Sequence, residues 1–284
     1  MTDACVVQFP HPGTEHKPPE DQDIMQWNTK SHRRKFLKAP GRLLGHDGDL
    51  IQTDVVFWGE YEAASRVIQR WPVSGGRPTA LHEPLLTVPP DSPKRQNTDP
   101  WVFGSRFLYS NCKQLTPSGG PSALQSLPRG SVILFGSQIH RRFCLDTVFV
   151  VAGAIPYRAR NAAELPVNEA FRTCTIESLA AYEHPTIDVP NARFTLYLGA
   201  TCGDPVDGMF SFTPARSADD GRLRFARPPY NDARFVNPRS KQSPSGAKAV
   251  MPMPEVRQAW DAAVGACRRR NISLAIQIGS PEPL

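Results

Sequence analysis

The segment DVVFWGEYEAASRVIQRWP, residues 54–72, carries the clearest strand signal of the chain. A run of β-forming residues is followed there by a second alternation of apolar and polar residues through Val67 and Ile68. A hairpin is predicted for residues 131–152, where SVILFGS and FCLDTVFVVA flank a polar turn that contains His140, Arg141 and Arg142. Extended structure is therefore expected to dominate the fold.

Weaker patterns predict further elements toward both ends of the chain. Residues 5–9 predict a short strand that stops at Pro10, and SHRRKFL at 31–37 predicts a short helix that ends before Pro40. Further strands are expected in segments 101–112, 194–212 (two strands around an Asp-rich turn) and 273–278.

Two segments have the pattern of helices. One short helix is predicted near residues 176–182. The stronger signal is at 255–270, where apolar residues recur every three or four positions. They place one apolar face on this helix, made by Val256, Ala259, Trp260, Ala263, Val264 and Cys267.

Composition agrees with a strand-rich chain. The 284 residues include 29 prolines and 20 glycines, which favour turns, edges and loops over long helices. We expect one α+β domain over residues 1–284, with a C-terminal helix and long loop excursions at about 73–100 and 213–250. Strand starts at Asp54 and Gly130 resemble those of PUA or ASCH-type barrels, which grip nucleobases.

Several classes of protein are disfavoured. The six cysteines are dispersed and form no CxxC pair, so neither a structural zinc site nor a disulfide scaffold is expected, and no metal or cofactor is predicted. The first residues lack the apolar core of a signal peptide, and no stretch approaches 18 apolar residues. A cytoplasmic protein with no membrane partner is the expectation.

The charge is compatible with a polyanionic partner. Lys and Arg number 33 against 27 Asp and Glu, a formal net charge of +6, and 25 of the 33 are arginine. Arginine suits phosphates because its planar fork of N–H donors matches their oxygens. A coding bias toward arginine would produce the same count, so the charge permits a nucleic-acid partner without requiring one.

The first group of candidate residues lies at the end of the strand near residue 58. Alternation in a strand would place Trp58, Glu60 and Glu62 on one face. If that face lines a cleft, repulsion and desolvation would raise the pKa of one carboxyl and make Glu60 a general acid or base. Trp58 could then stack on a base, although a solvated strand face would look the same.

A second group is basic or contains histidine. In the loop HPGTEH at 11–16, Pro12 and Gly13 make a metal-binding helix improbable, so His11 and His16 are expected to contact substrate or phosphate. The run that contains His32 and Arg33 is the most natural contact for a phosphate backbone, or simply a solvated basic face.

A third group brackets the predicted strand at 101–112. Asn97, Trp101 and Asn111 are candidates to bind a base, because amides read base edges and an indole stacks on them. Asp99 could orient or deprotonate a substrate. Cys112 beside Lys113 is a candidate nucleophile, although a free cysteine is more often a small core residue.

Three stretches together resemble a known family: VVQFPHPGTEHKP at 6–18, DVVFWGEYEAAS at 54–65 and LYLGATCGDPVDGMFSF at 196–212. They are similar to the DpdC-type proteins that bacteria encode with DNA 7-deazaguanine modification systems. The resemblance implies an enzyme that hydrates 7-cyano-7-deazaguanine in DNA to its amide. No catalytic residue is carried over from the family.

Nitrile hydration needs a nucleophile at the nitrile carbon and an acid to protonate its nitrogen. Cys112 could form a thioimidate, or Glu60 or Asp99 could activate water directly. The DNA would have to be single-stranded or have its base extruded. The alternatives are a non-catalytic reader of modified bases with a PUA-like pocket and a nucleotide-dependent transferase, the latter disfavoured because the usual nucleotide motifs are missing from the sequence.

Overall fold

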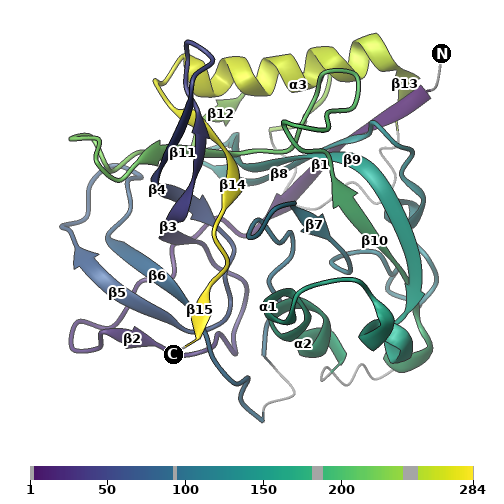
Figure 1. Ribbon diagram of the computed structural model, residues 1–284, viewed down its shortest axis with the longest axis horizontal. Coiled ribbons are helices and arrows are strands. Elements are labelled where there is room, and N and C mark those ends of the chain that lie inside the picture. Colours follow the sequence, from purple (N-terminus) through teal and green to yellow (C-terminus); the bar gives the residue numbers. More distant parts are fainter. Residues whose placement is uncertain (1–2, 92–94, 181–187, 239–248, 284) are drawn as a thin grey trace.

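Strands dominate the molecule and are arranged in two sheets, with the longest helix running across the top of the view in Figure 1. This computed structural model describes residues 3–91, 95–180, 188–238 and 249–283. Within these residues no helix combines the length and the apolar surface needed to cross a bilayer.

The seven-stranded sheet has the order β13-β1-β8-β9-β10-β7, with β12 paired to β9. Its strands are β1 (Asp3–His11), β7 (Leu108–Tyr109), β8 (Val132–Ile139), β9 (Arg142–Arg158), β10 (Arg193–Gly199), β12 (Pro229–Tyr230) and β13 (Ala249–Pro252). β1 runs parallel to β8, and β8 and β9 form the predicted hairpin. His140 and Arg141 turn the chain there with φ angles of 47° and 60°, values typical of the type I′ turns that fit twisted hairpins.

The eight-stranded sheet has the order β14-β11-β4-β3-β6-β5-β2, with β15 paired to β6. Its strands are β2 (Ile24–Met25), β3 (Lys35–Leu44), β4 (Leu50–Gly59), β5 (Ser65–Arg70), β6 (Ala80–Leu86), β11 (Thr213–Ser217), β14 (Ser273–Ile278) and β15 (Glu282–Pro283). Because β14 pairs with both β11 and β3, the strands β3, β4, β11 and β14 close into a small barrel. The predicted strand-rich α+β class with a barrel is confirmed.

The C-terminal helix α3 (Met253–Arg268) is also confirmed, and all six residues of its predicted apolar face are buried. α3 packs on β1, β8 and β14, so it covers strands of both sheets (Figure 1). The other helical elements are short: η1 (Ala123–Ser126), η2 (Ala159–Glu164), α1 (Glu169–Phe171), η3 (Arg172–Glu177), α2 (Ser178–Ala180) and η4 (Val189–Asn191). The helix predicted at 176–182 begins earlier, and residues 181 and 182 lie outside the described part of the chain.

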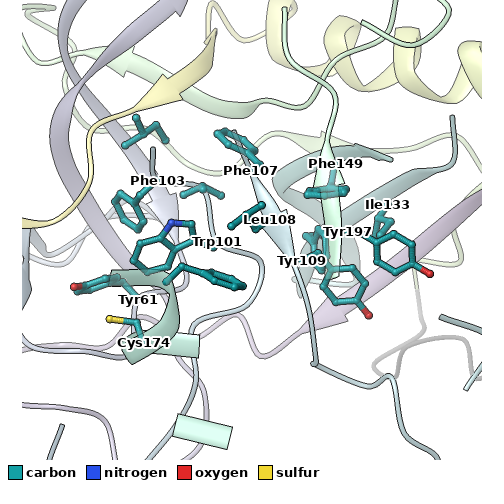
Figure 2. Close-up of a cluster of buried hydrophobic side chains, with 14 of the residues drawn as sticks. Tyr61, Trp101, Phe103, Phe107, Leu108, Tyr109, Ile133, Phe149, Cys174 and Tyr197 are labelled. Atoms are coloured by element: carbon teal, nitrogen blue, oxygen red, sulfur yellow. The ribbon is translucent and has the colours of Figure 1, made fainter. Parts of the chain in front are cut away.

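Two hydrophobic clusters form the core, and β4 contributes to both. Val55 and Phe57 belong to one cluster, whereas Val56 and Trp58 belong to the other, as alternation along a strand requires. Figure 2 shows the first cluster, in which Trp101 lies among Tyr61, Phe103 and Leu108. Both faces of β4 are therefore covered from Val55 to Trp58, which explains why this part of the strand is apolar without interruption.

Two short-range predictions are wrong. The segment 31–37 forms no helix, because β3 begins at Lys35 and continues past Pro40 to Leu44. β3 pairs with β6 at Leu37 and with β14 from Gly41 onward, and Pro40 lies between these two pairings. The N–H group that Pro40 lacks therefore removes no hydrogen bond to β6 or β14. β1 likewise passes Pro10 and ends at His11.

Other boundaries also differ from the prediction. The expected loop 73–100 contains β6, and the expected loop 213–250 contains β11 and β12. β11 and β12 are held by pairing with distant strands, which local propensity cannot reveal, whereas β6 pairs with the preceding strand β5. Segment 101–112 contributes only the two-residue strand β7, and segment 194–212 only one strand, β10.

Candidate functional site

Polar side chains from both sheets meet where β1 and β4 end. His11 is the last residue of β1, and Glu60 follows Gly59, the last residue of β4. Cys112 lies in the turn after β7. His11 and Glu60 are buried and Cys112 is half-buried, so the cluster lies at the edge of the core.

Cys112, His11 and Glu60 form a continuous chain of polar contacts. The Sγ atom of Cys112 lies 3.3 Å from Nε2 of His11, and Nδ1 of the same ring lies 2.6 Å from Oε2 of Glu60. A carboxylate accepts, so Nδ1–H of His11 donates to Glu60, and Nε2 is left to accept the thiol proton of Cys112. This is the arrangement of a nucleophile, a general base and the group that orients the base.

The pKa values of Cys112 and His11 favour a neutral thiol and a neutral imidazole. Burial lowers the pKa of His11 to about 4, although Glu60 opposes this shift, so the ring is neutral at pH 7. Burial also raises the pKa of Cys112 well above its ordinary value, and Asp99 and Glu60 add to that rise. Cys112 therefore rests as a thiol beside a neutral imidazole acceptor.

Glu60 stays ionised because cations surround it. Nη1 of Arg34 lies 2.5 Å from Oε2 of Glu60, and Nδ1 of His32 lies 3.0 Å from Oε1. Burial alone would raise the pKa of Glu60, but the contact with His11 and the charges of Arg34 and His32 hold it well below its usual range. The ionised carboxylate can thus stabilise an imidazolium that forms at His11.

Behind Glu60, an ion-pair network joins three further segments. Nε of Arg34 donates to Oδ2 of Asp146 at 2.9 Å, and Nη1 of Arg227 lies 3.2 Å from Oδ1. Ser137 donates to Asp146 and accepts from Arg227, which also donates to the Gly13 carbonyl oxygen. Burial disfavours the charge on Asp146, but Arg227 and Arg34 hold its pKa below the ordinary value. The network fixes Arg34, and through it Glu60.

Asp99 holds the turn that carries the thiol. Its oxygens accept the backbone N–H groups of Ser110, Asn111 and Cys112 at 3.0, 2.8 and 2.7 Å. Burial raises the pKa of Asp99 to about 7, against the effect of these three donors. With its acceptor positions occupied in this way, Asp99 is a positioning residue for Cys112.

Lys113 ties the same turn to β1. Its Nζ donates to the carbonyl oxygen of Pro10 at 3.1 Å and lies 5.1 Å from the ring centroid of Phe9. Lys113 has a φ of 59°, a value that non-glycine residues seldom adopt. The residue after Cys112 is therefore anchored to the strand that ends at His11.

No protein-family model, no curated protein and no solved structure matches this chain. The chemistry of the site is therefore read from its own residues. The specific comparison with PUA and ASCH-type barrels stays a prediction.

Seven of the residues singled out in the sequence come together in this cluster. They are His11, His32, Glu60, Asp99, Cys112, Asn111 and Asn97. The last two join each other, since Nδ2 of Asn97 donates to Oδ1 of Asn111 at 2.7 Å. The side chain of His32 is 22% exposed, so solvent reaches the cluster beside His32 and Cys112.

Four other candidates lie elsewhere or contribute differently. Trp58 is in the core, its N–H bonded to the carbonyl oxygen of Phe225, and Trp101 is fully buried, so neither offers a free face to a base. His16 pairs through its backbone with Arg34. The backbone N–H of Arg33 donates to Glu62 at 3.4 Å. β4 ends at Gly59, so Glu60 and Glu62 follow the strand and do not continue its alternation from Trp58.

Glu62 belongs to the cluster as well. Its Oε1 lies 3.0 Å from Nδ1 of His32, and its Oε2 accepts from Nδ2 of Asn28 at 2.5 Å. His32, Glu60 and Glu62 bring three potential metal ligands within 4.8 Å of one another. Although burial opposes it, the two carboxylates raise the pKa of His32 to about 10, so an imidazolium provides the positive charge there.

Proposed function

We propose that this chain is a cysteine-dependent enzyme that hydrates a nitrile on a nucleobase, converting 7-cyano-7-deazaguanine in DNA to the amide. The observation that carries the reaction class is the chain of contacts from Cys112 through His11 to Glu60. The nitrile and the nucleobase come from the family that stretches 6–18, 54–65 and 196–212 resemble.

In the first step the thiol of Cys112 attacks the nitrile carbon. Its proton passes to Nε2 of His11, and the imidazolium gives that proton to the nitrile nitrogen as the C–S bond forms. The product is a thioimidate, in which the carbon is bonded to sulfur and doubly bonded to NH. Glu60 stabilises the transient charge on His11 through its contact with Nδ1.

In the second step water resolves the thioimidate. Neutral His11 takes a proton from the water that adds to the carbon and gives it to the nitrogen, which becomes NH₂. The C–S bond then breaks as C=O forms, and the remaining hydroxyl proton passes through His11 to sulfur. The carbon retains the oxygen and the nitrogen as an amide, and sulfur regains its proton. The sum is nitrile plus water to amide, with no change of oxidation state and no co-reactant.

The arrangement favours covalent catalysis over direct activation of water by a carboxylate. Glu60 is held by His11 and Arg34, and Asp99 accepts three backbone N–H groups. Neither is free to act as the primary base. A duplex substrate would have to extrude the modified base, because the thiol lies within the protein surface and cannot reach into a base stack.

Product mass tests the proposal. The protein is incubated with single-stranded DNA that carries the nitrile base, the DNA is digested to nucleosides, and the base is weighed. A gain equal to the mass of one water is expected for the wild type and for Cys202→Ala, a matched half-buried cysteine away from the cluster. Cys112→Ala should give no gain. Binding without any mass change in the wild type would instead identify a non-catalytic reader.

A further inference from the structure

A cavity of about 740 Å³ opens between the end of β5 and the chain that joins β11 to β12. Five arginines line it: Arg77, Arg216, Arg222, Arg224 and Arg270. None of its described lining residues is acidic. None of the five arginines takes part in an ion pair found among the described residues.

Two of these arginines brace the cavity wall. Nη1 and Nη2 of Arg216 donate to the carbonyl oxygens of Arg222 and Arg270 at 2.5 and 3.3 Å. Nη2 of Arg224 donates to the carbonyl oxygen of Pro72 at 3.0 Å, and its guanidinium lies 5.1 Å from the ring centroid of Trp71. Their contacts hold in place the segments that carry the other arginines.

The charges of the other three arginines are not paired within the described residues. No side-chain hydrogen bond of Arg77, Arg222 or Arg270 is found within the described part of the chain, and all three are exposed. Burial lowers the pKa of Arg216, with Asp220 opposing and Arg222 and Arg77 adding to the decrease. The cavity thus concentrates the positive charge of five arginines, and the single neighbouring carboxylate of Asp220 does not balance it.

We infer that this arginine cavity, lined by Arg77, Arg222 and Arg270, binds phosphate groups of the DNA strand on which the enzyme acts. Guanidinium forks match phosphate oxygens in pairs, and a cavity with no competing carboxylate in its wall leaves those forks free. The inference rests on the proposed function, because it assigns the substrate's backbone to a second site apart from Cys112.

Binding of unmodified, fluorescently labelled single-stranded DNA tests this site without relying on the reaction. The double variant Arg222→Ala with Arg270→Ala should bind roughly tenfold more weakly, and the slope of log affinity against log salt should fall by about one to two. Arg129→Ala with Arg142→Ala is the matched control, since both are exposed arginines outside the cavity, and it should bind as the wild type does. The double variant Arg222→Lys with Arg270→Lys should keep part of the affinity that the alanine variant loses.

An equal loss in the two double variants, or no loss in either, would overturn the inference. Displacement of the strand by a deoxynucleoside triphosphate at matched concentration would also overturn it, because the cavity would then be a site for free nucleotides. Turnover of the free nitrile nucleoside, which has no phosphate, should be unchanged in the cavity variant. If no substrate is converted at all, the proposed reaction fails while the binding comparison still decides the cavity.

Discussion

Sγ of Cys112 lies 3.3 Å from Nε2 of His11, although 101 positions separate the two residues in the chain. Asp99 and Lys113 fix the turn on one side of this contact, and Glu60 and Arg34 fix the imidazole on the other. A thiol and an imidazole held in this way can exchange a proton without rearranging the backbone.

Cys112 should alkylate slowly in the native protein. Its pKa is raised, so little thiolate is present at pH 7, and the thiolate is the form that reacts with iodoacetamide. Peptide mass spectrometry after timed labelling should show slower modification of Cys112 than of the same residue in urea. Modification within the mixing time at pH 7 would contradict the neutral thiol.

Asp99→Asn should damage both stability and activity. An amide keeps one acceptor oxygen but directs an NH₂ group at a backbone N–H, so the free energy of unfolding should fall by about 1–3 kcal/mol. The thiol should also shift, and kcat should fall roughly 100-fold. Urea denaturation and turnover measure the two effects, with exposed Asp21→Asn as the control. Unchanged turnover would remove Asp99 from the account.

Arg34→Met should be strongly destabilising. It leaves the buried carboxylates of Glu60 and Asp146 without their shared partner, a change that costs about 3–5 kcal/mol. The control is Arg66→Ala, because Arg66 pairs with Glu83 at 3.5 Å on the surface and its loss should cost about 1 kcal/mol or less. Similar losses of unfolding free energy in both variants would count against the buried network.

His32 should make stability depend on pH in the alkaline range. Its pKa rises from 6.5 to about 10 on folding, so the folded state keeps a proton that the unfolded state releases. The stabilisation is fully present below pH 6.5 and is lost as pH rises through 10. The difference in unfolding free energy between wild type and His32→Gln should therefore shrink over this window, as measured by denaturation at several pH values. A constant difference would show that His32 is uncharged.

The regular elements were predictable where periodicity alone decides them. The hairpin of β8 and β9, the strands β4, β5 and β14, and the helix α3 all follow from local patterns. β11 gives no local signal because its partners, β4 and β14, lie far away in the sequence. β6 pairs with the preceding strand β5, and Glu83 and Pro84 interrupt its apolar pattern. The start of β3 at Lys35 was hidden by the neighbouring basic run.

The site was predictable as a set of residue types and not as an arrangement. The chemistry of their side chains makes Glu60, Asp99, Cys112 and His11 candidates, and only the meeting of the two sheets shows that they converge. The sequence makes Arg33 the candidate, whereas the structure buries Arg34, because the face of each residue depends on where β3 begins. Asp146 and Arg227 cannot be identified from the local sequence, because a single charged residue in or beside an apolar segment does not by itself indicate a site.

Covalent catalysis by Cys112 is tested by intact-protein mass spectrometry after acid quenching, with a nitrile-containing oligonucleotide as substrate. We expect a transient gain equal to the mass of the whole oligonucleotide, located on the peptide that contains Cys112 and lost in Cys112→Ala. Formation of the amide with no adduct at any time point, or an adduct on another residue, would contradict it.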